Sequence, residues 1–268
     1  MPDKEIPNMK PEVVDMSAHV DDFLDLDFLP VDYTVDVDGG SILPDYLAIS
    51  QPTSKIMTDE TNKIPLGEFY FAKHPTTVLG KTVVVLPISY VRVWFEVKKV
   101  PGKNLPVNVA IHEPDYTNDI DKSDYGNWIL PNGNSIREAC CFILIMKGFE
   151  YMGPVIFMLR STSIKAAKCW YTQLMQQRYP NNNKKLLPFF GRWWTIKVGA
   201  AQSSDAGTWF PFDGAIPEQY INEDFFLQNV KEVVPISKRI TNGLLAFDGA
   251  IDPTEPETEE KPDDPPPF

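Results

Sequence analysis

Basic and aromatic residues are interleaved on strongly β-forming stretches of the chain, and this combination is typical of a surface that holds nucleic acid. In the stretch 90–98, alternation places Tyr90, Arg92, Trp94 and Lys98 on one face. Single strands are held by a positive groove and by aromatic rings on which bases stack, at about 1–3 kcal/mol per base. Further candidates for such a surface are Lys147, Tyr151, Arg160, Lys184, Lys185, Arg192, Trp193 and Lys197.

Motifs for catalysis are incomplete. The stretch 75–82, PTTVLGKT, approximates a phosphate-binding loop, but Pro75 replaces the first glycine and a β-forming run follows where a helix is required. The stretch 34–45 resembles a calcium loop, with Thr34 at the first ligand position and Asp45 at the twelfth, where glutamate is expected. The three histidines are scattered and accompany no nucleophile motif. We therefore expect no enzyme, no cofactor and no metal.

One acidic cluster keeps an alternative open. Residues 108–133 form a long predicted loop that contains Asp115, Asp119, Asp121 and Asp124. Long loops commonly carry function. A solvated loop is the favoured interpretation, and a metal-dependent nuclease that uses these carboxylates is the alternative.

The charge is unevenly distributed. The chain of 268 residues has a net charge of −12, which by itself argues against nucleic acid. However, residues 1–38 carry −9 and residues 252–268 carry −6, so the part between them is net positive. Within that part, residues 137–202 carry +8. A basic middle between acidic ends favours an anionic partner for the middle.

The two ends differ from the middle in composition. Residues 1–40 form an acidic arm, in which 21–40 alternates acids with Phe, Leu, Tyr and Val, as in a short strand or an acidic-hydrophobic interaction segment. Residues 241–268 form an acidic, proline-rich tail that buries too little apolar surface to fold. We expect disordered ends around one nucleic-acid-binding domain, 41–240.

The middle of the chain, residues 41–240, is predicted to be mainly β. Strands are predicted at 81–99, 139–147, 151–160 and 190–200, with the second and third forming a hairpin and Pro87 marking a bulge, bend or edge. A helix is predicted over 161–180 and a second near 220–234. One helix inserted among strands matches a five-stranded barrel of the oligonucleotide-binding (OB) type, so we expect an OB-fold-like barrel with one inserted helix.

Other features bear on location. No apolar run reaches the roughly 18 residues of a membrane span, and the N-terminus has no signal-peptide core. Three cysteines, two of them adjacent, provide no disulfide framework. We expect no membrane partner and a cytoplasmic protein, in the host cytoplasm if a phage encodes it.

The last residues, KPDDPPPF, resemble the C-terminal tips of bacterial and bacteriophage single-stranded DNA-binding proteins. The order of DFLP, LGEFYF, VVVLPISYVRVW, RWWTIKV and an acidic tail is similar to a phage version of that family. The resemblance implies an OB fold and a tip that recruits replication or recombination proteins through Asp263, Asp264, Pro267 and Phe268.

Together these features predict a phage-type single-stranded DNA-binding protein without sequence preference, acting in replication or recombination. Its acidic tail would compete with DNA for the basic surface and recruit partners. A phage structural or assembly protein, or a strand-annealing or RNA-binding protein, are the alternatives. The sequence leaves the oligomeric state open.

Overall fold

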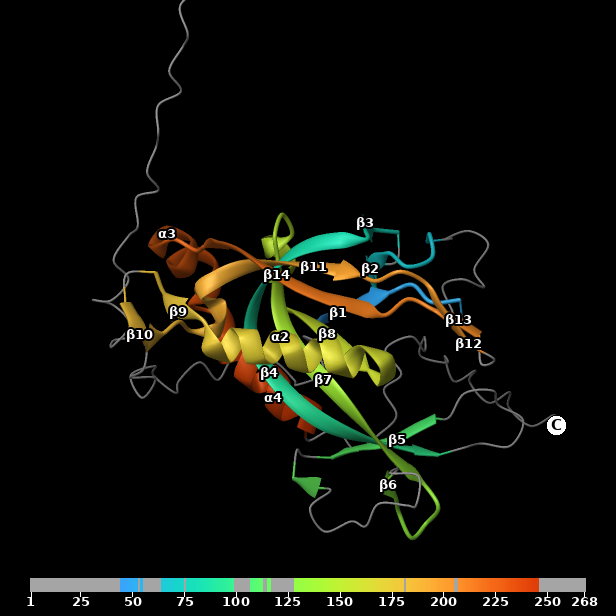
Figure 1. The fold of residues 1–268 in the computed structure, drawn as a ribbon. Helices are drawn as coiled ribbons and strands as arrows, with labels where there is room; N and C mark the ends of the chain where they lie inside the picture. Colours follow the sequence, from blue (N-terminus) through green and yellow to red (C-terminus); the bar gives the residue numbers. More distant parts are fainter. Residues whose placement is uncertain are drawn as a thin grey trace, which may run out of the picture.

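The computed structural model describes residues 44–52, 54, 64–74, 76–98, 107–112, 115–116, 128–180, 182–204 and 207–245. These residues form a mainly β structure, in which a curled, half-barrel sheet packs against one long helix (Figure 1). The strands are β1 (Asp45–Ile49), β2 (Phe69–Phe71), β3 (Val78–Gly80), β4 (Thr82–Lys98), β5 (Val107–His112), β6 (Trp128–Ile129), β7 (Ser135–Met146), β8 (Val155–Arg160), β9 (Arg178–Tyr179), β10 (Asn182–Leu186), β11 (Arg192–Val198), β12 (Gln202–Ser204), β13 (Gly207–Trp209) and β14 (Phe212–Tyr220).

The helical elements are placed between and after these strands. The long helix is α2 (Ile164–Gln176), and a helical region from residue 223 to residue 245 follows the last strand. That region consists of α3 (Glu223–Phe225), the π-helical turn η8 (Phe226–Val230) and α4 (Val233–Leu245). Short 3-10 turns are η5 (Glu150–Met152), η6 (Ser161–Ser163) and η7 (Phe189–Gly191).

The expected mainly β architecture is therefore confirmed. The main sheet has the strand order β14-β11-β4-β7-β8-β1-β2-β3, with β5 also paired to β4 and β6 to β7. Neighbours in it are antiparallel except β1 and β8, which are parallel. The predicted hairpin of β7 and β8 is present, with Gly148 of its turn at a φ of 83°. The predicted second helix extends beyond 234, because α4 ends at Leu245 and so includes residues that we assigned to the tail.

A bulge in β4 decides which side chains face which side of the sheet. Pro87 pairs with Leu144 and Ser89 with Ile143 of β7, so Ile88 is an additional residue. Because successive strand residues point to opposite faces, one additional residue reverses the alternation that follows it. Before the bulge, odd-numbered residues of β4 face α2; after it, the even-numbered Tyr90 packs on that side. Pro87 thus marks a bulge.

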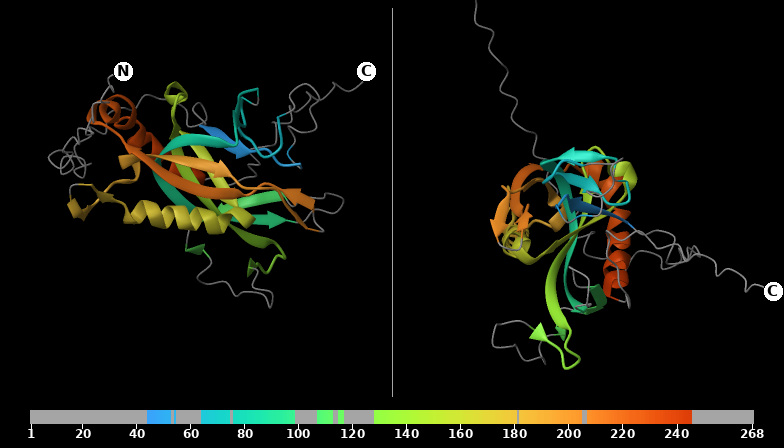
Figure 2. Two further views of the ribbon diagram at one scale, coloured as in Figure 1. Left: turned by 45° about the horizontal axis from the view of Figure 1, so that its top comes forward. Right: turned by 90° about the vertical axis from the view of Figure 1, so that its right-hand side faces the viewer.

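Each face of the sheet is covered by a different helix. The α2 face holds a core to which the helix contributes Ala167, Trp170 and Leu174. On the other face, Ile240 of α4 packs against the odd-numbered β4 residues after the bulge. Figure 2 shows the two helices on opposite sides of the sheet. Both helices bury a stripe of apolar residues against the strands, and this burial holds each in place.

The hydroxyl residue at the beginning of α2 has a structural role other than capping. Ser163 makes no capping bond, and its Oγ instead accepts a hydrogen bond of 3.0 Å from the backbone nitrogen of Phe212. The buried Ser163 thereby attaches the helix to the first residue of β14. A backbone N–H inside the core requires a partner, and this hydroxyl supplies it.

The half barrel is held together on one side by a glutamine. The Gln51 Nε2 donates to the carbonyl of Phe210 at 2.7 Å, and Gln51 Oε1 accepts from the Phe210 nitrogen at 2.8 Å. The side-chain amide thus satisfies the Phe210 backbone as a neighbouring strand would. Gly67, at a φ of 72°, lies directly against the Phe210 ring, where a Cβ atom would overlap it.

The far half of the sheet extends away from α2 as an arm. We use "the arm" for β5, β6, residues 92–98 of β4 and residues 135–139 of β7, which lie at the lower right of Figure 1. β4 and β7 run through from the body into the arm without ending. None of the helices in the described ranges has the length and apolarity needed to cross a bilayer.

Candidate nucleic-acid interface

The arm carries a cation beside aromatic rings on the side of the sheet that α2 covers in the body. Arg92 is exposed, and its guanidinium carbon lies 5.7 Å from the centroid of the Trp94 ring. Trp94 in turn meets Trp128 of β6 edge to face, with centroids 6.1 Å apart. We call Arg92, Trp94, Trp128, His112 and Tyr116 the arm face.

The Trp94 ring is packed into this surface instead of standing out from it. It is 8% exposed and forms a small cluster with Leu130 and Ile136, against which Trp128 and Tyr116 pack. The sequence placed Trp94 correctly on the face of Arg92, but it gave no sign that residues 116 and 128–136 would cover the ring. The half-buried Trp128 and Tyr116 are the rings that reach the surface there.

Trp128, Tyr116 and His112 were missed as individual candidates. All three fall in the stretch 108–133, which was expected to be a long functional loop, and parts of it form β5 and β6. The rings of His112 and Tyr116 stack in parallel, with centroids 3.6 Å apart and an interplanar angle of 5°. Aromatic residues within a predicted functional loop were the signal that could have identified them.

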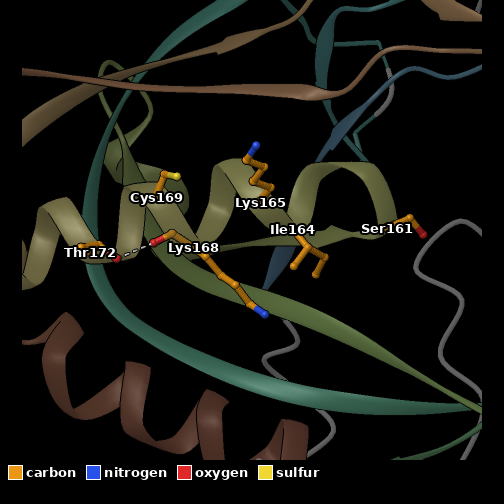
Figure 3. A pocket seen from close by; sticks show the side chains of 6 residues that line it. All are labelled: Ser161, Ile164, Lys165, Lys168, Cys169 and Thr172. Atoms are coloured by element: carbon orange, nitrogen blue, oxygen red, sulfur yellow. Dashed lines mark hydrogen bonds between the residues drawn. The ribbon is translucent and has the colours of Figure 1, made fainter. Parts of the chain in front are cut away.

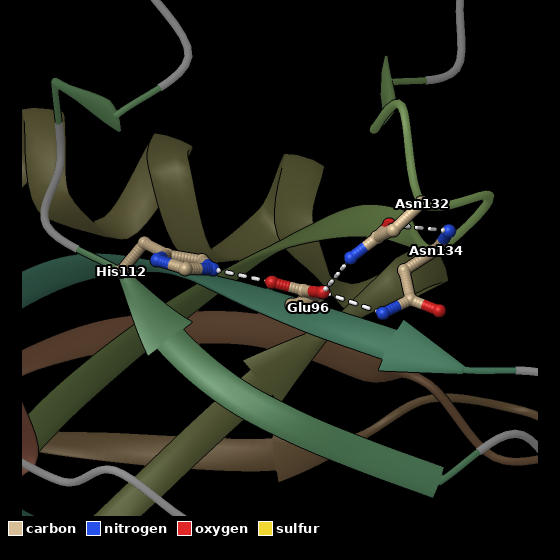
Figure 4. Close-up of polar contacts among 4 residues, drawn as sticks. All are labelled: Glu96, His112, Asn132 and Asn134. Atoms are coloured by element: carbon tan, nitrogen blue, oxygen red, sulfur yellow. Dashed lines mark hydrogen bonds and ion pairs between the residues drawn. The ribbon is translucent and has the colours of Figure 1, made fainter.

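A buried carboxylate organises the tip of the arm (Figure 4). Glu96 is 9% exposed and accepts hydrogen bonds from His112 Nε2 at 3.0 Å, Asn132 Nδ2 at 3.0 Å and Asn134 Nδ2 at 2.5 Å. Burial by itself raises the pKa of Glu96, but the three hydrogen bonds outweigh it and hold the pKa below its ordinary value. The ionised Glu96 therefore ties β5 and the β6–β7 turn to β4.

Tyr90 lies where the arm meets the body. Its ring stacks on Tyr171 of α2, with centroids 4.2 Å apart, and its hydroxyl lies 3.3 Å from the Cys140 Sγ. Burial, and then the hydrogen bond to Cys140, raise the pKa of the Tyr90 hydroxyl. Of the residues predicted on this strand, Tyr90 is thus engaged with the helix, Arg92 and Trp94 belong to the arm face, and Lys98 is exposed at the strand end.

The outer surface of α2 adjoins this region and is slightly hollow (Figure 3). The hollow is lined by Ser161, Ile164, Lys165, Lys168, Cys169 and Thr172. Lys168 Nζ lies 2.7 Å from Glu138 Oε2, and Glu138 stands opposite Trp94 in the β4–β7 ladder. This contact joins the hollow of α2 to the arm.

The other predicted residues do not join the arm face. Trp193, a predicted nucleic-acid contact, is 4% exposed and packs against Phe225 on the α4 side, so its ring does not lie at the surface. Residues of α3 and η8 cover this side of β11. The exposed Lys147 lies over its ring at 5.7 Å. Arg160 lies 4.0 Å from the Phe95 centroid, on the face opposite Arg92.

Further predicted residues lie at separate places on the body. Arg192 stands over the rings of Trp194 and Tyr220 and donates to the Glu218 carbonyl at 3.1 Å. Lys197 is half-buried on β11, and Lys184 and Lys185 lie on the β9–β10 hairpin, with Lys185 over Tyr179. Tyr151 is 82% exposed in the turn after β7. The predicted tail residues Asp263, Asp264, Pro267 and Phe268 lie outside the described residues.

The acidic loop also falls mostly outside the described residues. Asp115 is described and exposed, while Asp119, Asp121 and Asp124 are not described. Across the described ranges, no three His, Cys, Asp or Glu side chains are grouped as metal ligands would be. The metal alternative therefore stays untested.

The fold and the arm define a half-barrel protein whose sheet extends into a projecting β arm. Residues 46–233 match the family of Pam3 phage gp34-like proteins, and the chain belongs to that family. The expectation of a bacteriophage origin is thus confirmed, and the family's description states no activity. No curated protein and no solved structure matches the chain.

Proposed function

We propose that this phage protein binds single-stranded DNA, and that the arm face is its primary contact. The observation that carries the proposal is the exposed Arg92 beside Trp94 and Trp128. A guanidinium can pair with a phosphate, while an aromatic ring at the surface offers a plane to a base. Neither contact reads base edges, so the binding would be independent of sequence.

The charge distribution supports an anionic ligand for the middle of the chain. The cationic surplus of residues 137–202 includes Lys165 and Lys168, which line the hollow next to the arm. A strand that leaves the arm face along α2 would pass these lysines. Each phosphate neutralised by a cation releases counterions, and binding then weakens steeply with salt.

The proposal extends to the acidic tail. Residues 252–268 carry seven acidic residues and one lysine. Attached to the same chain, they would compete with DNA for the cationic surface at an effective concentration that can reach the millimolar range. The terminal DDPPPF would recruit replication or recombination proteins, as the resemblance to single-stranded DNA-binding proteins suggests.

Titration of oligo-dT across a range of salt concentrations tests the proposal. Arg92→Gln should weaken binding about threefold to tenfold and reduce the slope of log affinity against log salt by about 0.7, the value for one phosphate contact to a single strand. Arg239→Gln, at an exposed position on α4, removes the same charge from the opposite side and should change neither quantity. Deletion of residues 252–268 should tighten binding.

The same titration can overturn the proposal. If neither the full chain nor the tail-deleted form binds oligo-dT at low salt, the phage structural or assembly role becomes the better interpretation. If Arg92→Gln and Arg239→Gln weaken binding equally, the arm face is not the primary contact. Competition between DNA and RNA, and a strand-annealing assay, distinguish the remaining alternatives.

A further inference from the structure

The hollow on α2 combines cations with apolar groups at its edges. In Figure 3, Ile164 and Lys168 project on one side of the helix, and Lys165 and Cys169 project on the other. Lys165 and Cys169 are exposed. Such a surface suits a segment that alternates apolar and acidic side chains, because the apolar groups cover Ile164 and Cys169 while the carboxylates meet Lys165 and compete with Glu138 for Lys168.

The chain contains one segment of that composition. Residues 21–38, DDFLDLDFLPVDYTVDVD, have seven acidic residues, no lysine or arginine, and Phe, Leu, Val or Tyr between the acids. We infer that this N-terminal segment docks in the hollow of α2 and covers the adjoining edge of the arm face. The N-terminal segment would then be an internal ligand of a surface next to the proposed DNA contact.

The connection to the body allows this contact. β1 starts at Asp45 and runs parallel to β8, with Asp45 paired to Val155. The six steps along the chain from Val155 to Ser161, the first residue of the hollow, cover about 20 Å of extended chain. Because β1 and β8 run parallel, a chain that precedes Asp45 has to turn back to approach Ser161. The fourteen steps from Pro30 to Pro44 can extend to about 46–50 Å, which leaves length for this turn, so the middle of residues 21–38 can reach the hollow.

The C-terminal tail is the weaker candidate for this place. Residues 252–268 are equally acidic for their length, but Phe268 is their one apolar residue other than proline. They would meet the lysines and leave Ile164 and Cys169 uncovered. They also follow α4, which packs on the opposite face of the sheet from α2. Apolar content and the position of attachment both favour the N-terminal segment.

Disulfide trapping in the full-length protein tests the docking without DNA. Cys169 is an exposed thiol inside the hollow, whereas Cys140 and Cys141 are buried. Pro30→Cys introduces a thiol into the segment without removing an acidic or apolar residue. Mild oxidation should form a 30–169 disulfide within one molecule, detected by peptide mapping of the monomer. Pro262→Cys is the matched control in the tail and should form at least fivefold less of its disulfide to Cys169.

A second pair of variants checks the chemistry of the contact. Lys165→Glu with Lys168→Glu should reduce the 30–169 disulfide several-fold, whereas Lys238→Glu with Arg239→Glu on α4 should not. Absence of the disulfide, an equal yield from Pro262→Cys, or a link formed between two molecules would each overturn docking within one chain. A link between two molecules would identify a second copy as the occupant.

The consequence for DNA rests on the proposed function and is measured separately. If the docked segment covers part of the DNA contact, deletion of residues 1–40 should tighten oligo-dT binding about threefold or more. Disulfide formation without any DNA binding would sustain the docking and reject the proposed function. DNA binding without the disulfide would sustain the proposed function and reject the docking.

Discussion

Trp194 and Trp128 belong to the two ends of one sheet and have different surroundings. In the body, Trp194 of β11 is 2% exposed and packs with Trp170 of α2, with ring centroids 6.3 Å apart. In the arm, Trp128 is half-buried in a small cluster at the far end of β4 from β11. Arg192 lies 6.0 Å from the Trp194 ring, and Trp128 meets Trp94, over which Arg92 lies.

Alternation along a strand thus predicts on which side of the sheet a residue lies, and not which element covers it. Arg192 and Trp194 share a face of β11, as Arg92 and Trp94 share a face of β4. The body face is closed by α2, whereas a short strand and a turn cover the arm face. The same sequence pattern therefore yields a core in one place and a partly open surface in the other.

The largest expected effect is on stability in the body. Trp194→Ala should lower the free energy of unfolding by about 3–5 kcal/mol, because a large ring is removed from a closed core. Trp128→Ala should cost less than about 2 kcal/mol, since its ring already contacts water. Urea denaturation measures both. Equal losses would show that the arm is as well packed as the body.

A smaller effect is expected at the arm tip. Glu96→Gln should destabilise the protein by about 1–3 kcal/mol at neutral pH, because a charged acceptor of three hydrogen bonds is lost. Folding lowers the pKa of Glu96. The stability that the Glu96 charge contributes is therefore complete above the ordinary glutamate pKa of about 4.3, and it is lost as the pH falls through the lower pKa of the folded state.

In thermal unfolding between pH 7 and pH 3, the stabilities of wild type and Glu96→Gln should therefore converge in the acidic range. Glu232→Gln, at an exposed site next to α4, should follow the wild type throughout. A constant difference between Glu96→Gln and wild type down to pH 3 would show that the Glu96 charge does not stabilise the arm.

The closure of the half barrel should depend on Gln51. Gln51→Ala leaves the Phe210 N–H and carbonyl without their side-chain partners, and we expect a loss of about 1–2 kcal/mol. Gln173→Ala, at an exposed position on α2, should cost less than about 0.5 kcal/mol. Equal values in denaturant titrations would mean that water replaces the Gln51 amide without loss.

The smallest expected effect is on Arg92. Arg92→Gln should change the free energy of unfolding by at most about 1 kcal/mol, the range of an exposed cation–aromatic contact. A loss as large as that of Trp194→Ala would make Arg92 a structural residue and would remove the contrast between arm and body.

Much of the fold could be predicted because its signals are local. Both ends of β4 lie within one residue of the ends of the predicted strand 81–99, and α2 falls inside the predicted helix 161–180. The bulge was indicated by Pro87, because proline cannot donate in a sheet ladder. The parallel pairing of β1 with β8 joins residues about 110 positions apart, and nothing in the local pattern indicated it.

The candidate site could be predicted less completely. Tyr90, Arg92 and Trp94 were assigned to one face correctly, since their spacing fixes it. Cover by another element is a tertiary property, so the burial of Trp193 under η8 and of Tyr90 under Tyr171 could not be read from spacing. The polar bonds of Glu96 likewise come from three separate segments.

The uninterrupted course of β4 has a mechanical consequence. The strand has 17 residues, about 55 Å of chain at 3.3 Å per residue, and it pairs with β7 from Val85 to Val97. A load applied at the tip of the arm is therefore transmitted into the body along the continuous β4 backbone and its hydrogen bonds to β7. Amide hydrogens should exchange first at the tip and progressively later toward the bulge, so the arm would fray from its end instead of swinging about a joint.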